Sequence, residues 1–199
     1  MKGEKGEKRK QELLQIAYRL FLSKGYEETS VDEIIEEAQI AKGTFYYHFK
    51  SKEVLLEELI NKMITEKAKQ AKKFLTAPLS APQKTVAIIT SLRPEQTEMD
   101  IQNALHKKEN AIIHEKINQR VIDEAVPILC EVVSEGIAQG ILKCDSNIKE
   151  RVRMTLIISS AVFDHESFTP ADIDVYIDTV EKLLGAKKNT FEFIRQLIQ

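Results

Sequence analysis

The sequence has little of what β-rich, secreted or membrane-spanning proteins need. Its 199 residues include seven glycines and five prolines, and so few helix breakers favour long helices over a turn-rich sheet. No apolar run approaches the roughly 20 residues of a membrane-spanning helix, and the charged start, Met1–Lys5, is unlike the apolar segment of a signal peptide. Because no signal-like leader precedes Cys130 and Cys144, we expect a cytoplasmic protein with free thiols and no membrane contact.

The remaining composition is that of an ordinary globular protein. Hydrophobic residues make up 43% of the chain and charged residues 30%, and the length suits one large domain or two small ones. The formal net charge is -2, which by itself argues weakly against a nucleic-acid-binding protein. Any basic surface that binds nucleic acid must therefore be local.

Apolar residues recur at helical spacing along most of the chain, which predicts an all-α fold. Ser30 and Glu33 form a capping box that starts one helix, and Gly185 ends another. We predict helices over residues 10–23, 31–38, 42–49, 52–75, 83–92, 96–107, 110–139, 147–163 and 170–184, with a short one in the tail 190–198. Pro127 lies inside the helix over 110–139 and should kink it.

The most informative segment is residues 29–52, TSVDEIIEEAQIAKGTFYYHFKSK. It holds two short amphipathic helices joined by a tight turn, and helices this short must pack on their neighbours to be stable. A helix-turn-helix is built in this way: one helix braces against the DNA backbone while the next lies in the major groove. The recognition helix would be residues 42–49.

The recognition helix carries unusual chemistry. Phe45 and Phe49 are four residues apart and should point into the core, so Tyr46 and Tyr47 project away from it. In an arbitrary protein such aromatics are about as often partly buried packing residues, and His48 could simply cap the helix. The composition of this helix therefore favours DNA binding only modestly.

The start of this helix and the residues after it add contacts that suit DNA. Gly43 lets the backbone approach a phosphate or a base edge closely, and Thr44 can hydrogen-bond either group. Lys42, Lys50 and Lys52 make this short stretch basic on a chain of net negative charge. We therefore expect the basic surface to be local to this helix.

A dense pattern of residues runs from Leu13 to Leu55. It reads Leu13-Leu14-x-Ile16-Ala17, Leu20-Phe21-x-x-x-Gly25-Tyr26, Thr29-Ser30-Val31-x-x-Ile34 and Ala41-Lys42-Gly43-Thr44-Phe45-Tyr46-Tyr47-His48-Phe49-x-Ser51-Lys52-x-x-Leu55. This pattern, over residues 8–60, resembles the DNA-binding domain of the TetR/AcrR family of bacterial transcriptional regulators. The resemblance implies a helix-turn-helix domain over residues 1–52, joined by a long helix to a ligand-sensing and dimerising helical domain over residues 53–199.

The resemblance also implies a set of DNA contacts and a mode of action. Thr29 and Lys52 would hold phosphates, while bases or backbone would be contacted by Lys42, Gly43, Thr44, Tyr46, Tyr47 and His48. The implied protein is a homodimer that binds palindromic double-stranded operator DNA, most commonly as a repressor released by a small-molecule effector. Neither the effector nor the target operon follows from the sequence.

Two features of the C-terminal part agree with dimerisation. Residues 154–163, MTLIISSAVF, are apolar or small on every side, so this helix must be covered both by its own domain and by something else. The next helix carries an apolar stripe, and the pair suits a two-fold four-helix interface, although an ordinary monomer core is the alternative. The expected interface residues are Met154, Ile158, Ala161, Val162, Ile173, Tyr176, Ile177, Val180 and Leu184.

An effector pocket is harder to derive from the residues. Candidates to line a hollow are Met63, Phe74, Met99, His106, His114, Phe163, His165 and Phe168, each of which is individually more typical of core or surface. No carboxylate or cysteine stands at metal-ligand spacing beside His106 or His114, so neither a metal nor a cofactor is expected. Cys130, in an apolar stretch, is expected to be buried, and Cys144, in a loop, to be exposed.

Two other classes of protein compete with a ligand-controlled regulator. An enzyme is disfavoured because the sequence has no glycine-rich phosphate loop, no G-x-S-x-G elbow, no H-E-x-x-H pair and no paired catalytic set. A DNA-binding accessory protein that responds to no ligand is the alternative within DNA binding. The size of the C-terminal part favours a sensor, since a dimerisation module alone could be shorter.

Overall fold

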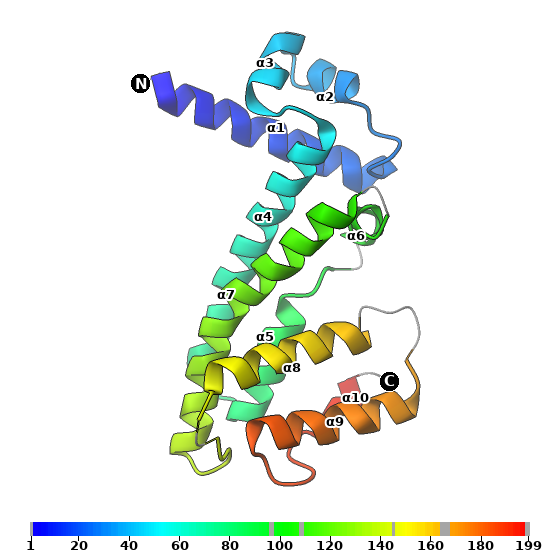
Figure 1. Ribbon diagram of the computed structural model, residues 1–199. Coiled ribbons are helices and arrows are strands. Elements are labelled where there is room, and N and C mark those ends of the chain that lie inside the picture. The colour runs from blue at the N-terminus through cyan, green and yellow to red at the C-terminus, as the bar shows by residue number, and fades with distance from the viewer. Residues whose placement is uncertain (1, 96–97, 108–109, 145, 164–167, 198–199) are drawn as a thin grey trace. The chain divides into compact units, whose positions relative to one another are not determined.

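The structure, a computed structural model, describes residues 2–95, 98–107, 110–144, 146–163 and 168–197, and this part of the chain is helical without a β-strand (Figure 1). The helices are α1 (Lys2–Lys24), α2 (Val31–Glu37), α3 (Lys42–His48), α4 (Lys52–Ala71), the 3-10 helix η1 (Lys72–Thr76), α5 (Ala81–Ser91), α6 (Met99–Leu105), α7 (Ala111–Ala138), α8 (Ile148–Phe163), α9 (Pro170–Leu184) and α10 (Ile194–Leu197). The all-α class predicted from the sequence is confirmed.

Two helix ends differ clearly from the predicted ones, the start of α1 and the end of α4. α1 begins at Lys2, well before the apolar periodicity starts, because a polar helical turn leaves no apolar signal. The long helix predicted to reach residue 75 ends as an α-helix at Ala71 and continues as the tighter η1. Pro127 lies inside α7, as predicted.

The described chain divides into two compact units. Unit 1 comprises residues 1–64 and 94–120, and unit 2 comprises residues 65–93 and 121–199. This division differs from the single boundary after residue 52 that the sequence suggested, because α6 and the start of α7 pack with the N-terminal helices. Both α4 and α7 run without a break from one unit into the other.

The core of unit 1 is built around aromatic rings from α1 and α3. Phe21, Phe45 and Phe49 are completely buried, together with Leu13 and Leu55. The rings of Phe45 and Phe49 lie 5.9 Å apart, and the ammonium of Lys10 lies 5.6 Å from the centre of the Phe49 ring. The buried rings and the Lys10 contact hold the inner face and the C-terminal end of α3 in the core of unit 1.

Polar links join α6 and the start of α7 to the rest of unit 1. The Tyr18 hydroxyl donates to Glu98 at 3.4 Å, and burial of Tyr18 raises the pKa of that hydroxyl, with the Glu98 charge adding to the effect. Two exposed ion pairs add to this link, Lys107–Glu27 at 2.8 Å and Lys116–Glu57 at 3.1 Å. Residues 94–120 therefore belong to the same compact body as α1 and the first turns of α4.

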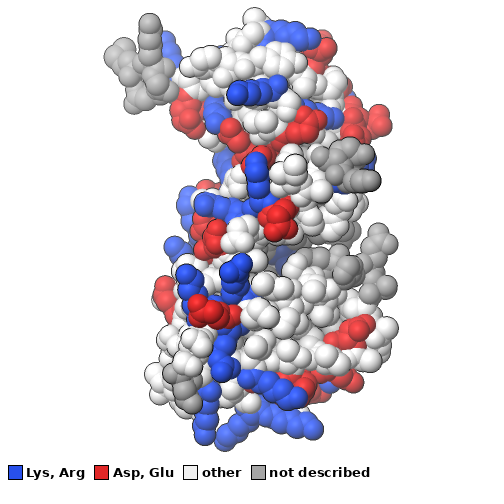
Figure 2. Space-filling view, viewed as in Figure 1, with Lys and Arg blue, Asp and Glu red and all other residues white. Residues whose placement is uncertain are grey.

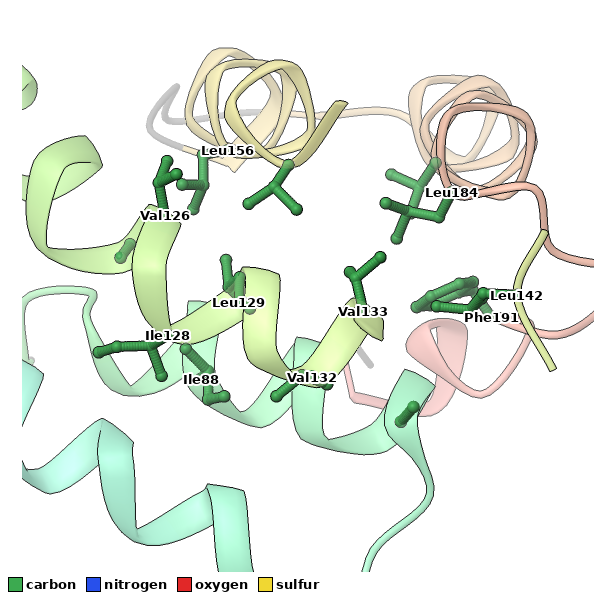
Figure 3. Close-up of a cluster of buried hydrophobic side chains, with 14 of the residues drawn as sticks. Ile88, Val126, Ile128, Leu129, Val132, Val133, Leu142, Leu156, Leu184 and Phe191 are labelled. Carbon is green, nitrogen blue, oxygen red and sulfur yellow. The ribbon is translucent and has the colours of Figure 1, made fainter. Parts of the chain in front are cut away.

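The core of unit 2 is centred on α7, which packs on α5 with one face and on α8 and α9 with the other (Figure 3). Ile128 and Val132 point toward Ile88 of α5, while Val126 lies against Leu156 of α8 and Val133 faces Leu184 of α9. Leu142 and Phe191 close the end of this cluster. A helix in such a position must be apolar on two faces, as the sequence of α7 is.

Buried polar groups in unit 2 hold helix ends in place. Lys84 is buried and donates to the Leu75 carbonyl at 2.8 Å and to Glu135 at 2.8 Å, so it joins η1, α5 and α7. Arg151 donates to the Leu183 carbonyl at 2.6 Å and thereby caps the C-terminus of α9. The Cys144 thiol donates to the same carbonyl at 3.6 Å and is buried, so the exposed thiol expected from its loop position is wrong. Cys130 is half-buried.

Candidate DNA interface

Helix α2 begins at a capping box, and the turn that leads from α2 to α3 is closed by backbone hydrogen bonds. Ser30 accepts a hydrogen bond from the Glu33 backbone N–H at 3.1 Å, and Glu33 accepts one from the Ser30 N–H at 2.9 Å, as predicted. After α2, Gln39 adopts a left-handed backbone with φ +51°, which reverses the chain within a few residues. The result is two seven-residue helices joined by a tight turn.

α3 presents two different faces. Phe45 and Phe49 are 0% exposed, whereas Tyr46 is 46% and Tyr47 is 82% exposed, so the facing predicted from the four-residue spacing is confirmed. An aromatic ring that is four-fifths exposed contributes little to the fold of its own chain. The outer face of α3 therefore offers apolar rings with polar tips to a partner.

The first turn of α3 is open to solvent. Lys42 and Gly43 are exposed and Thr44 is half-exposed. A Cβ atom placed on Gly43 would meet nothing within 4 Å, so packing within the chain does not require glycine at this position. Close approach of a ligand to the backbone is a sufficient reason for a glycine here.

Two residues expected to hold phosphates instead hold the turn between α1 and α2. Thr29 is completely buried, and its hydroxyl donates to the Gly25 carbonyl at 2.8 Å. The Lys52 ammonium donates to the carbonyls of Tyr26 at 2.9 Å and Thr29 at 3.0 Å, and it lies 4.2 Å from the centre of the Tyr26 ring. In the DNA-free structure both side chains are thus held by backbone carbonyls, and their contact with phosphates stays a prediction.

The remaining predicted residues stay at the surface of the helix-turn-helix. His48 is half-buried at the end of α3, with its ring 5.0 Å from the Tyr47 ring. Asp32 of α2, which sequence reasoning did not single out, accepts a hydrogen bond from Lys42 at 3.1 Å. The signal for Asp32 was present as an acid in the first turn of α2, but the sequence does not show that α2 and α3 bring the two side chains together.

The candidate pocket residues are divided between the two units. Met63, His106 and His114 belong to unit 1, whereas Phe74, Phe163 and Phe168 belong to unit 2. The imidazole rings of His106 and His114 lie 4.7 Å apart, and the Phe163 ring packs on that of Tyr176 at 4.9 Å. The side chain of Met99 and all of His165 lie outside the described residues. Among the described residues, no group of three or more histidine, cysteine or acidic side chains could hold a metal ion.

The paired helices α8 and α9 place the expected interface residues on two different sides. Five of them point into the core of their own chain: Ile173, Tyr176, Ile177, Val180 and Leu184. Tyr176 is fixed there by a hydrogen bond of 2.8 Å between its hydroxyl and that of Ser159. Assigning these five to the interface is therefore wrong, because apolar periodicity alone does not say which apolar face turns inward.

The outer face of the same helix pair keeps an apolar surface. Met154 and Ala161 are exposed as the dimer prediction requires, and Ile158 and Val162 are half-buried. Ile157 of α8 is 40% exposed and Val175 of α9 is 66% exposed. These two residues were missed in the sequence, although both lie in apolar stretches.

The described residues include no helix that is both long and apolar enough to cross a lipid bilayer. The fold and the outer face of α3 together define a DNA-binding transcriptional regulator with a helix-turn-helix.

Known proteins resemble both the N-terminal part of the chain and most of its length. The sequence profile described as "Bacterial regulatory proteins, tetR family" matches residues 13–59. The chain is 28% identical over 171 residues to the uncharacterized HTH-type transcriptional regulator YhgD of Bacillus subtilis, covering 81% of this chain and 86% of YhgD. It is 24% identical to the HTH-type transcriptional repressor KstR2 of Mycolicibacterium smegmatis, over 70% of each chain. A match at 49% identity to YuxN of Bacillus subtilis, an uncharacterized HTH-type transcriptional regulator, covers 25% of this chain and 17% of that protein.

Solved structures share the fold. A TetR-family regulator from Mesorhizobium loti aligns with a TM-score of 0.61 at 19% identity, over 90% of this chain and 96% of that one. The regulator FadR from Bacillus subtilis, solved in complex with stearoyl-CoA, aligns with a TM-score of 0.54 at 19% identity, over 87% of this chain and 97% of that one. Residues 13–59 therefore match the DNA-binding domain of the tetR family, and the chain as a whole is similar to regulators of that family.

Proposed function

We propose that this protein is a repressor that binds a palindromic operator as a homodimer and leaves it when a small-molecule effector binds. The observation that carries the proposal is the division of α3 into a buried Phe45–Phe49 face and an exposed face with Tyr46 and Tyr47. Exposed aromatic rings beside Lys42 and the open backbone at Gly43 suit phosphates and base edges in a major groove. The name of KstR2 supports repression rather than activation.

The homodimer rests on the outer face of α8 and α9. Exposed Met154, Ile157 and Val175 form an apolar face that water solvates poorly. A second copy of the chain would cover it by two-fold symmetry and pair four helices. Such a dimer reads two half-sites about 34 Å apart, one DNA turn, which makes the operator palindromic.

The effector is expected to act through the two helices that the units share. α4 and α7 run from unit 1 into unit 2, so a ligand that changes the packing of unit 2 changes helices that also build unit 1. The effector must then bind the DNA-free form more tightly than the DNA-bound form. We propose no cofactor, metal or enzymatic activity. A DNA-binding regulator of bacterial genes works in the cytoplasm, in agreement with Cys130 and Cys144, whose thiols are not joined in a disulfide.

DNA binding is tested by selecting duplexes from a random pool with the purified full chain. The affinity for the selected duplex and for a random duplex of equal length is then measured by fluorescence anisotropy. We expect a palindromic consensus, a tighter complex with the selected duplex, and a logarithm of affinity that falls linearly with the logarithm of salt concentration. Failure to enrich any sequence, or an affinity that does not change with salt, would contradict the proposal.

The selection experiment separates DNA-binding proteins from enzymes, and adding small molecules to the complex separates the two kinds of DNA-binding protein. An accessory DNA-binding protein would bind DNA, and no small molecule would release it from the DNA. An enzyme would enrich no DNA sequence at all.

A further inference from the structure

Helix α2 carries an unusual charge for an element that lies against DNA. Four of its seven residues are acidic, namely Asp32, Glu33, Glu36 and Glu37. In the space-filling view, acidic and basic side chains lie next to one another over the end of unit 1 that holds α2 and α3 (Figure 2). Phosphates repel carboxylates, so each acid on this surface weakens DNA binding unless a cation holds it.

Three of the four acids are paired, and they are paired with different elements. Glu33 pairs with Lys24 and Glu37 pairs with Arg19 at 3.0 Å, and both partners belong to α1. These two pairs are therefore made within the body of the unit, between α2 and α1. Asp32 instead pairs with Lys42 at 3.1 Å, and Lys42 is the first residue of the recognition helix.

The pair between Asp32 and Lys42 is open to solvent. The two side chains are 76% and 63% exposed, so nothing within the chain shields their charges or prevents them from separating. Asp32 raises the pKa of Lys42, first through the hydrogen bond and then through its charge. An exposed pair of this kind contributes little to the fold.

We infer that Asp32 occupies Lys42 in the DNA-free protein as a phosphate does in the complex, so that DNA binding exchanges a carboxylate for a phosphate on the same ammonium. The inference rests on the proposed DNA contact of Lys42. Asp32 thereby lowers the affinity for every DNA sequence alike, because neither the carboxylate nor a phosphate carries base identity. A regulator that is weakened uniformly spends less time on non-specific DNA.

The exchange has a signature in the salt dependence. A lysine that meets a phosphate from free solution contributes up to about 0.9 to the slope of log affinity against log salt. A lysine that must first leave a carboxylate contributes less, because salt also weakens the internal pair and so partly compensates. Removing the Asp32 charge should therefore tighten binding and steepen the slope at the same time.

The test compares Asp32→Asn with Glu36→Gln in the full chain. Glu36 lies four residues after Asp32 on the same side of α2, is exposed, and has no ion pair or hydrogen bond through its side chain in the described structure, so its neutralisation controls for the change in net charge. We expect Asp32→Asn to tighten binding to a random duplex about two- to fivefold per bound subunit, with a steeper salt slope. A selected duplex should be tightened by the same factor.

The double variant with Lys42→Met identifies the route of the effect. In the Lys42→Met background, Asp32→Asn should tighten binding by a smaller factor, because no ion pair is left to exchange. An equal effect in both backgrounds, or an equal effect of Glu36→Gln, would overturn the exchange and leave a simple charge effect. Tightening confined to the selected duplex would also overturn it, since that result requires a base contact.

A measurement without DNA separates failure of the inference from failure of the proposed function. The Lys42 ammonium can be titrated by NMR after isotope labelling of the lysine side chains, and its pKa should fall in Asp32→Asn. An unchanged pKa would show that the pair is not formed in solution and would overturn the inference even if DNA binds. Absence of binding to any duplex by the unaltered chain, with a normal titration of Lys42, would instead overturn the proposed function.

Discussion

Lys42 and Lys52 lie ten residues apart in one basic stretch, and their surroundings give them different roles. Lys52, at the start of α4, donates to backbone carbonyls of the turn between α1 and α2. Lys42 contacts only groups at the surface, among them Asp32. Residue type and charge are identical, so the difference comes entirely from tertiary structure.

Replacing each lysine with methionine should therefore affect different properties. Lys52→Met removes the donor to the carbonyls of Tyr26 and Thr29, and we expect a loss of about 1–3 kcal/mol in the free energy of unfolding. Lys42→Met should change stability by no more than about 0.5 kcal/mol, while the salt slope of DNA binding falls by up to about 0.9 per subunit. Urea denaturation and anisotropy titrations measure the two effects. The opposite pattern would return Lys52 to the DNA interface.

The two faces of α3 allow a second comparison. Phe45→Ala leaves a cavity in the core of unit 1 and should cost about 3–5 kcal/mol of stability. Tyr47→Ala removes an exposed ring and should leave the thermal midpoint nearly unchanged while it weakens binding to a selected duplex. Circular dichroism and anisotropy distinguish the two variants. If Tyr47→Ala unfolded the domain and still bound DNA in the cold, the facing of α3 would be wrong.

For single residues, the sequence predicts burial better than it predicts hydrogen-bond partners. The spacing of Phe45 and Phe49 is a local property of a helix, and it correctly placed both rings in the core. The partners of Thr29 and Lys52 are backbone carbonyls brought close by the packing of α1, α2 and α4. No local pattern contains that information.

Helix ends depend on a few backbone positions, of which Gly185 at the end of α9 is the most constrained. Its φ is +63°, and a Cβ atom there would come within 2.1 Å of the Lys143 carbonyl oxygen. The close approach exists because the Lys143 N–H donates to the Gly185 carbonyl at 3.0 Å. Gly140 also has a positive φ, +71°, but has open space around its Cβ position.

The two glycines make a matched pair of substitutions. Gly140→Ala should cost about 1–2 kcal/mol, the price of a left-handed backbone for a residue with a side chain. Gly185→Ala meets the same backbone cost and also the collision with Lys143, so it should cost at least about 1 kcal/mol more than Gly140→Ala. Urea denaturation at equilibrium measures both. Equal losses would mean that the loop at Lys143 moves away freely.

The order and type of the helices followed from the sequence because caps and apolar spacing act within one element. Thr169 caps α9 through a reciprocal contact with Asp172, and this contact also lowers the pKa of that carboxyl through the backbone hydrogen bond and then the side-chain one. Ends without an apolar signal, such as the start of α1 at Lys2, did not follow. A helix end that is set by a capping residue can therefore be predicted from neighbouring residues, whereas an end without a cap or an apolar signal cannot.

Across the whole molecule, the sequence predicted the helix-turn-helix but not the division into units. The pairing of Tyr18 with Glu98 spans most of unit 1 in sequence and assigns residues 94–120 to the DNA-binding body. In the same way, the apolar residues on every side of α8 predict that it is covered on two sides. Only its packing on α9 shows which of its residues are exposed.

The exposed face of α8 and α9 gives a prediction about assembly. Ile157→Glu or Val175→Glu should weaken the dimer at least about 100-fold, because two copies of each carboxylate would be buried at the interface. Ile112→Glu is the control, since Ile112 is 75% exposed but lies in unit 1 at the start of α7. Sedimentation equilibrium measures the dissociation constants. Unchanged assembly in both α8 and α9 variants would place the dimer contact elsewhere.

Binding of an effector to unit 2 should be coupled to binding of DNA by unit 1. Since α4 and α7 belong to both, an effector that binds unit 2 and favours the DNA-free form must bind more weakly to protein already on its operator. A panel of chemically diverse small molecules supplies the compounds to be tested. Calorimetric titration of each compound into the free protein and into the complex with a selected duplex measures the coupling. For a true effector we expect affinities that differ by about 5- to 150-fold. Equal affinities would eliminate that compound, and equal affinities for every compound that binds would leave a DNA-binding protein that no ligand controls.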